Sequence, residues 1–167
     1  MIAIGIDPGM TGAVAAIRSD ARGRDREVLG VWNNPVHQVG KKNLPHVKGM
    51  QNLLCDILID YTWQVVVVGI EKQQERPYQS VVKAERSIVR QYGVWEGLVA
   101  ARDWEYELVA PKDWQKLMLP GSRRTKVNIK TLSQRKAKEL YPHIHVGRHD
   151  RADALLIASY IERLHGR

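Results

Sequence analysis

Residues 65–70 are the part of the sequence that most restricts how this chain can fold. They read Val-Val-Val-Val-Gly-Ile and contain no polar side chain. Valine and isoleucine favour strands. A strand that is apolar at every position, and not only at alternate ones, is typical of a sheet covered on both faces. We therefore predict a sheet with this strand at its centre and helices on both sides.

The segments around this strand predict the rest of the sheet. Residues 2–6, 13–17 and 27–32 resemble strands, and a glycine-rich turn joins the first two as a hairpin. Residues 33–45 are predicted to form a surface loop. Helices are predicted over residues 47–61, 80–102, 111–119, 125–141 and 150–164, and a fifth strand over 105–110. This order predicts an α/β fold with a mixed five-stranded sheet, in one domain over residues 1–167.

The positive charge of the chain is concentrated in one segment. Residues 111–151 hold eleven Lys and Arg against three Asp and Glu, which accounts for the whole net charge of +8. A one-sided segment of this kind is typical of proteins that bind a polyanion such as DNA. The candidate phosphate contacts are Lys116, Arg123, Arg124, Lys126 and Lys130. Tyr78, in a polar loop, could stack on an unpaired base.

Four carboxylates occupy positions that a folded sheet could bring together. Asp7 ends the first strand, and Glu71 directly follows the valine strand. Asp150 and Asp153 open the last helix, and a spacing of three places them on one helix face. If the first and fourth strands are neighbours, these side chains meet at one edge of the sheet. Carboxylate oxygens suit Mg²⁺ or Mn²⁺, and two such ions can promote phosphodiester hydrolysis.

Each of these carboxylates also has a structural explanation. Asp7 before Pro-Gly could simply form a turn. Asp150 could cap the last helix, and Asp153 could be stabilised by the helix dipole. Glu71 is harder to explain in this way, because it follows a buried strand. The four residues together, in this order, favour a metal site.

The remaining metal-binding and thiol side chains predict less. His143, His145 and His149 have no cysteine nearby, so a zinc site is not expected, and His149 is predicted to be a surface residue. The single cysteine, Cys55, is predicted to be buried in a helix. The absence of a disulfide fits a reducing cytoplasm, and no apolar run is long enough to cross a membrane. The five tryptophans are mostly predicted to pack in the core or at an interface.

These motifs resemble the RuvC family of Holliday-junction resolvases. The opening segment 4–12 (Ile-Gly-Ile-Asp-Pro-Gly-Met-Thr-Gly) is similar to the family's first motif, and segment 68–71 to its second acidic strand. Segment 92–97 falls where the family has a glycine-containing helix. Segment 150–158 (Asp-Arg-Ala-Asp-Ala-Leu-Leu-Ile-Ala) is similar to the closing motif. The resemblance spans almost the whole chain and implies a ribonuclease H-like fold.

The resemblance also implies an activity in DNA recombination and repair. It implies a homodimer that nicks two opposed strands of a four-way junction, with two Mg²⁺ (or Mn²⁺) ions in each active site. The implied metal ligands are Asp7, Glu71, Asp150 and Asp153. Lys126, read as opening a helix, matches a DNA-binding lysine of the family. Gln115 stands where a second one aligns, so Lys116 beside it takes that role.

The sequence departs from the family in several places. It contains no phenylalanine, and Gln74 lies where bacterial members have an aromatic residue, a role that Tyr78 could take over. Residues 33–45 and the pair Arg123–Arg124 are unlike bacterial members. These departures indicate a divergent branch, of the kind found in phages.

Three other functions compete with this interpretation. The turn after Asp7 also resembles the phosphate loop of actin-like ATPases, but 167 residues leave no room for their second lobe. A nuclease of the same fold that acts on RNA–DNA hybrids, or on branched DNA other than four-way junctions, would use similar carboxylates. A non-catalytic junction-binding module would keep the basic segment. It would have no need of four carboxylates, which repel DNA.

Overall fold

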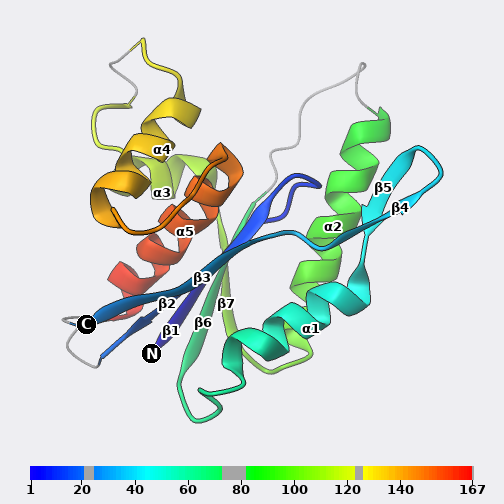
Figure 1. Cartoon of the computed structure of the whole chain (residues 1–167), viewed down its shortest axis with the longest axis horizontal. Coiled ribbons are helices and arrows are strands. Elements are labelled where there is room, and N and C mark those ends of the chain that lie inside the picture. The colour runs from blue at the N-terminus through cyan, green and yellow to red at the C-terminus, as the bar shows by residue number, and fades with distance from the viewer. Residues whose placement is uncertain (21–24, 73–81, 123–125, 167) are drawn as a thin grey trace.

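The computed structural model describes residues 1–20, 25–72, 82–122 and 126–166 (Figure 1). Its main sheet has the strand order β3-β2-β1-β6-β7. The strands are β1 (Ile2–Asp7), β2 (Ala13–Ser19), β3 (Arg26–Asn33), β6 (Val66–Glu71) and β7 (Glu105–Val109). β1 pairs antiparallel with β2 and parallel with β6, so the sheet is mixed. The predicted five-stranded mixed sheet is confirmed, and the valine strand lies inside it between β1 and β7.

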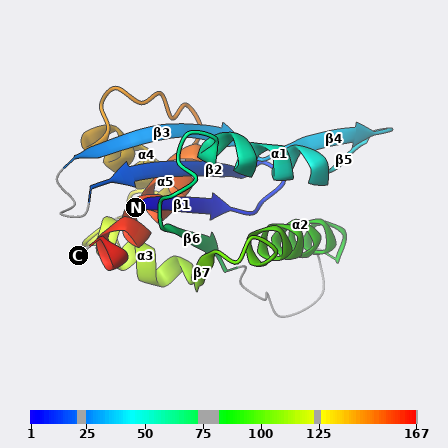
Figure 2. The ribbon, with the colours of Figure 1, turned by 90° about the horizontal axis from the view of Figure 1, so that it is seen from below.

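Helices cover both faces of this sheet, as predicted. The helices are α1 (Val47–Leu58), α2 (Val82–Ala100), α3 (Pro111–Met118), α4 (Ile129–Leu140) and α5 (His149–His165). α1 and α2 lie on one face, and α3, α4 and α5 on the other (Figures 1 and 2). None of the helices in the described ranges is long and apolar enough to span a membrane.

Small residues on one face of β1 allow α5 to lie directly on the sheet. The isoleucines at alternate positions of β1 pack into the core under α1 and α2, which leaves Ala3 and Gly5 on the α5 side. A Cβ atom at Gly5 would lie 2.2 Å from the carbonyl oxygen of Ala154. At Gly69, the register partner of Gly5 in β6, a Cβ atom would lie 2.5 Å from the Ile161 side chain. This pair of glycines fixes how α5 crosses β1 and β6.

The predicted surface loop over residues 33–45 is wrong. The segment forms an antiparallel hairpin of β4 (Val36–Val39) and β5 (Lys42–Pro45), separate from the main sheet. Gly40 and Lys41 form its two-residue turn, with Gly40 at a φ of 61°. Glycine at the first turn position is typical of tight hairpins. Every β4 side chain is exposed, so the segment lacks the buried alternation that identifies a strand.

Two smaller predictions also need correction. The helix predicted over residues 125–141 begins only at Ile129, because the Asn128 side chain accepts a hydrogen bond from the Lys130 amide and caps it. Lys126 therefore precedes the helix. Cys55 is exposed, because the buried face of α1 passes through Leu54 and Ile57. The prediction that the tryptophans mostly pack in the core is confirmed for four of the five, while Trp63 lies on the surface with 82% of its area exposed.

Candidate active site

Asp7 stands at the end of β1 in a tightly held turn. The Gly9 amide donates a hydrogen bond of 3.1 Å to Asp7 Oδ1. The side-chain amide of Asn34 donates to the carbonyl oxygens of Asp7 and Gly9, each at 2.7 Å. A Cβ atom at Gly12 would lie 2.1 Å from the Asp7 carbonyl oxygen, so glycine is needed where the turn closes. Asn34, which is 4% exposed, was not predicted, because its role depends on a contact across the fold.

Glu71 stands at the end of β6, beside β1. The indole N–H of Trp114 donates a hydrogen bond of 2.9 Å to Glu71 Oε1. Trp114 comes from α3 and is 1% exposed, so it packs in the core and also orients the carboxylate. The core packing of Trp114 was predicted from the sequence, but its hydrogen bond to Glu71 was not. β6 and α3 together therefore place Glu71 at the same edge of the sheet as Asp7.

The first two turns of α5 supply the other two carboxylates. Asp153 Oδ1 is buried without a hydrogen-bond partner among the described residues. Both oxygens of Asp150 are engaged, since Arg148 Nη2 lies 3.1 Å from Oδ2 and His149 Nε2 lies 2.9 Å from Oδ1. His149 was predicted to be a surface residue, but it is half-buried and contacts this carboxylate. Asp150 is not the helix cap either, because the N-cap is Arg148.

Burial makes these carboxyl groups weaker acids than exposed carboxyl groups. Burial, followed by the negative charge of Asp150, raises the pKa of Asp7 from 3.8 to about 6, against the opposing Gly9 hydrogen bond. Burial, followed by the charge of Asp7, raises the pKa of Glu71 from 4.5 to about 8, although the Trp114 hydrogen bond lowers it. Asp7 therefore lies close enough to both Asp150 and Glu71 for their negative charges to repel.

Asp153 belongs to the same group. Burial raises its pKa from 3.8 to about 7, and the charges of Asp7 and Asp150 add to this increase. The Ser133 hydroxyl lowers the pKa, although the two side chains do not meet in hydrogen-bond geometry. Lys130 lowers the pKa of both Asp153 and Asp7, so its positive charge lies near the group.

This donor set fits a hard divalent cation in its chemistry. The ligands are carboxylate oxygens, one of them a buried orphan, and their repulsion would be relieved by positive charge. Within the described ranges, however, no three His, Cys, Asp or Glu side chains converge closely enough to hold an ion. The carboxylates are grouped at one edge of the sheet, but they do not form a closed ligand shell.

Three of the predicted DNA-binding residues lie in the described part of the chain, and one of these, Lys130, is near the carboxylates. Lys116 is exposed in the last turn of α3, and Lys126 is exposed just before α4. Lys130, in the first turn of α4, is exposed near Asp7 and Asp153. Tyr78, Arg123 and Arg124 lie outside the described residues.

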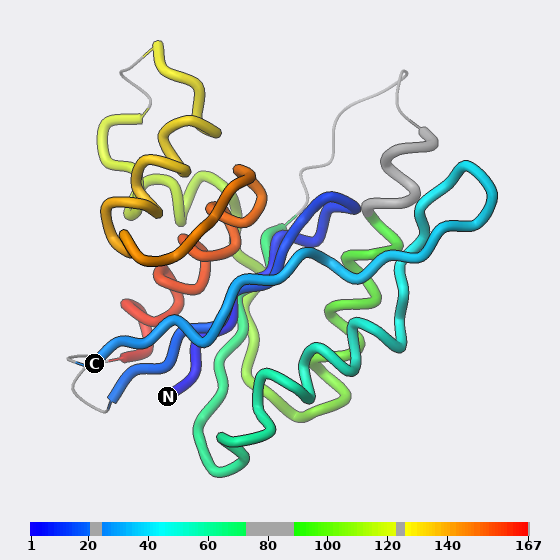
Figure 3. Tube along the Cα trace, viewed as in Figure 1, coloured from blue at the N-terminus to red at the C-terminus, as the bar shows by residue number. Residues whose placement is uncertain are grey.

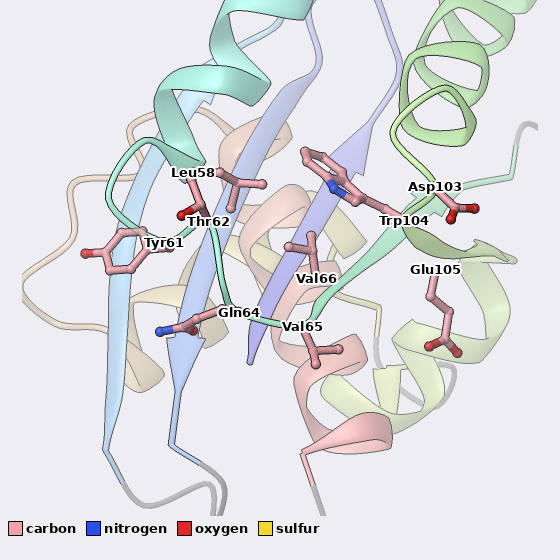
Figure 4. Close-up of a pocket in the computed structure, with 9 residues that line it drawn as sticks. All are labelled: Leu58, Tyr61, Thr62, Gln64, Val65, Val66, Asp103, Trp104 and Glu105. Carbon is pink, nitrogen blue, oxygen red and sulfur yellow. The ribbon is translucent and has the colours of Figure 1, made fainter.

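A cavity of about 340 Å³ lies elsewhere in the molecule and does not contribute to this group. Tyr61 and Trp104 flank it, with Glu105 at its rim (Figure 4). Val66, which begins β6, and Glu105, which begins β7, both line it. The cavity is therefore at the opposite end of these strands from Glu71.

Solved structures of other proteins support the fold described above, although sequence comparisons find no relative. A scan against protein-family models gives no match, and a search of curated protein sequences gives none either. Thermus thermophilus RuvC superposes with a TM-score of 0.65 at 16% identity, covering 98% of this chain and 96% of that chain. T. thermophilus RuvC in complex with a Holliday-junction substrate gives 0.62 at 14% identity, covering 99% and 98%.

A third solved structure extends the comparison to a eukaryotic organelle. The yeast mitochondrial Holliday junction resolvase Ydc2 has a TM-score of 0.54 at 16% identity, covering 96% of this chain and 77% of that chain. At identities this low, the superpositions establish a common fold and no more. The chain therefore has a RuvC-like, ribonuclease H-like fold over almost its whole length.

Proposed function

We propose that this protein is a metal-dependent endodeoxyribonuclease that resolves four-way (Holliday) DNA junctions by paired symmetric nicks. One observation carries the proposal: Asp7, Glu71 and Asp153 are buried at one edge of the sheet, where burial raises the pKa of each and the charge of Asp7 raises those of the other two. Burying like charges destabilises a fold, and such groups are typical of functional sites. The RuvC-like fold and the basic segment support DNA as the substrate.

In this proposal the chain prepares a site for two Mg²⁺ ions, for which Mn²⁺ can substitute. Asp7, Glu71, Asp150 and Asp153 are the proposed ligands and catalytic residues. When bound, the divalent ions would activate a water and stabilise the charge on the leaving 3′ oxygen. Asn34 fixes the backbone turn that carries Asp7. The Trp114 indole orients the carboxylate of Glu71 through its hydrogen bond.

The proposed DNA contacts lie in the basic segment. Lys116, Arg123, Arg124, Lys126 and Lys130 would contact phosphates, and Tyr78 would stack on an unpaired base. Support for a branched substrate comes from T. thermophilus RuvC, which has been solved in complex with a Holliday-junction substrate.

A homodimer with two equivalent sites would explain paired nicks. The α2 surface around Gly93 and Gly97 is open, since a Cβ atom at either position meets no atom within 4 Å. A second copy of the chain could approach closely there. This oligomeric state is part of the proposal.

One observation favours a different function, a junction-binding module without catalysis. Arg148 and His149 contact the two side-chain oxygens of Asp150. If these contacts exclude a metal ion, the cluster of four carboxylates would have a structural role only. In that case the basic segment would act alone.

A cleavage assay on a set of substrates separates these functions. Wild-type protein is incubated with a labelled four-way junction, a fork, a duplex and an RNA–DNA hybrid, with Mg²⁺, Mn²⁺ or chelator. The proposal predicts symmetric nicks in the junction that require metal. Cutting confined to forks or hybrids would keep the nuclease and reject the substrate, and tight junction binding without cutting would favour the binding module.

A further inference from the structure

The β4–β5 hairpin contributes almost nothing to the core. All four residues of β4 are exposed, and in β5 only Leu44 and Pro45 are partly or fully buried. The hairpin forms a separate two-stranded sheet that extends past the end of the main sheet (Figures 1 and 3). An isolated hairpin is at best marginally stable in water. β5 packs against α2, but the exposed side chains of β4 call for an explanation other than packing.

The surface of the hairpin carries positive charge and no negative charge. Residues 36–45 contain no Asp or Glu, whereas they contain two lysines and one histidine. Lys41 and Lys42 lie at the tip, both exposed, and no ion pair engages either of them among the described residues. Two adjacent unpaired cations on a projecting arm are suited to contact phosphates.

The base of the hairpin is fixed to the candidate active site. Asn34 stands between β3 and β4, and its side chain holds the Asp7 turn while its own amide donates to the Gly12 carbonyl oxygen at 2.9 Å. The amide of His46 donates to the Pro35 carbonyl oxygen at 3.0 Å and closes the base of the hairpin. The hairpin therefore holds a set position relative to Asp7.

The hairpin and the basic segment lie on different sides of the candidate site. Figures 1 and 2 both place the turn between β1 and β2 between them, with α3 and α4 on one side and the hairpin on the other. A substrate that reaches both would pass over Asp7. The major groove of DNA also admits a two-stranded β-ribbon.

We propose that the β4–β5 hairpin is a second DNA-binding element, which contacts the phosphate backbone of a duplex arm through Lys41 and Lys42. This inference rests on the proposed function, because it requires a DNA substrate at the carboxylate group. It adds a contact that lies outside the basic segment at residues 111–151. The hairpin thereby defines a DNA path across the active site from both sides.

The test is junction binding by a variant that combines Lys41→Ala and Lys42→Ala. Binding of a labelled four-way junction is measured in chelator, by fluorescence anisotropy, over a range of salt concentrations. We expect affinity to fall about tenfold and the slope of log K against log salt to decrease in magnitude by about 2, one for each lost phosphate contact. Combined Lys41→Arg and Lys42→Arg should restore both values.

A matched control removes the same charge elsewhere. Arg18 pairs with Ile2 at the end of β1 far from Asp7, and Arg163 lies in the last turn of α5, so the combined Arg18→Ala and Arg163→Ala variant should bind as wild type does. Equal losses in the control, or an unchanged slope in the hairpin variant, would overturn the inference while wild-type binding and cutting upheld the proposed function. Failure of the wild type to bind any branched DNA would instead reject the function itself.

Discussion

Three residues of the candidate site are costly to bury. Asp7, Glu71 and Asp153 are carboxyl groups taken out of water and placed near one another, so their ionised forms are disfavoured. The few partners they have, such as Trp114 for Glu71, offset only part of this cost. A bound cation would reverse the balance, because it favours the ionised forms. The stability of the protein should therefore depend on both pH and metal.

The sign of that dependence follows from the raised pKa values. The pKa of Glu71 is about 8 in the folded chain against 4.5 ordinarily, so the folded state binds more protons than the unfolded state between these values. The stability this group contributes is greatest below the lower value and is lost as pH rises through the upper one. Glu71→Gln removes the titration and keeps an oxygen that can accept from Trp114.

Chemical denaturation in chelator tests this prediction. Between about pH 5 and about pH 9, the free energy of unfolding of wild type should fall relative to that of Glu71→Gln. Adding Mg²⁺ at the alkaline end should stabilise wild type more than the variant. A difference that does not change with pH, together with no effect of Mg²⁺, would contradict the account of these carboxylates.

The sequence identifies the carboxylates more readily than the residues that hold them. Asp7 and Glu71 could be predicted because each follows an apolar strand, which is a local pattern. The roles of Asn34 and Trp114 could not be predicted, because each depends on contact between segments far apart in the sequence. The contact of His149 with Asp150 could not be predicted either, because it depends on a local geometry that many sequences share. Whether the four carboxylates act as metal ligands stays a prediction.

Among the elements, the glycine pair under α5 decides where the carboxylates meet. Gly5 and Gly69 are opposite one another in β1 and β6, and α5 rests on both. A helix held away from the sheet would carry Asp150 and Asp153 away from Asp7 and Glu71. Periodicity predicted each of these elements, but it cannot report how closely two of them approach. The exposed hairpin was missed for a related reason, since it buries no face that a pattern could show.

Gly5→Ala tests this close approach. The new methyl group would meet backbone atoms of α5 at 2.2 and 2.3 Å, and backbone cannot rotate away as a side chain can. We expect a loss of about 3 kcal/mol or more in the free energy of unfolding. Gly93→Ala is the matched control at concentrations low enough for the chain to be monomeric, because its methyl group enters open space on the α2 of a single chain and should stabilise the helix by up to about 1 kcal/mol. Thermal or chemical unfolding of both variants measures the difference, and equal effects would show that α5 does not require glycine.

At the scale of the whole molecule, positive charge flanks a negative centre. The basic segment lies on one side of the carboxylates and the hairpin lies on the other (Figure 1). In the proposed complex without metal, the carboxylates would repel the DNA backbone that the flanking lysines would attract. The molecule should therefore bind DNA without metal and cut it only with metal, so that binding and cutting depend on different residues.

The central claim is that the carboxylate group performs catalysis, and Asp7→Asn tests it most directly. Junction binding in chelator and junction cutting in Mg²⁺ are measured for wild type and variant, after thermal unfolding confirms that both are folded. The account predicts that cutting falls about a thousandfold or more, since a lost metal ligand removes several kcal/mol of transition-state stabilisation. Binding should be preserved or strengthened, because a negative charge near the DNA is removed. Cutting at the wild-type rate, or loss of binding by a folded variant, would contradict the account.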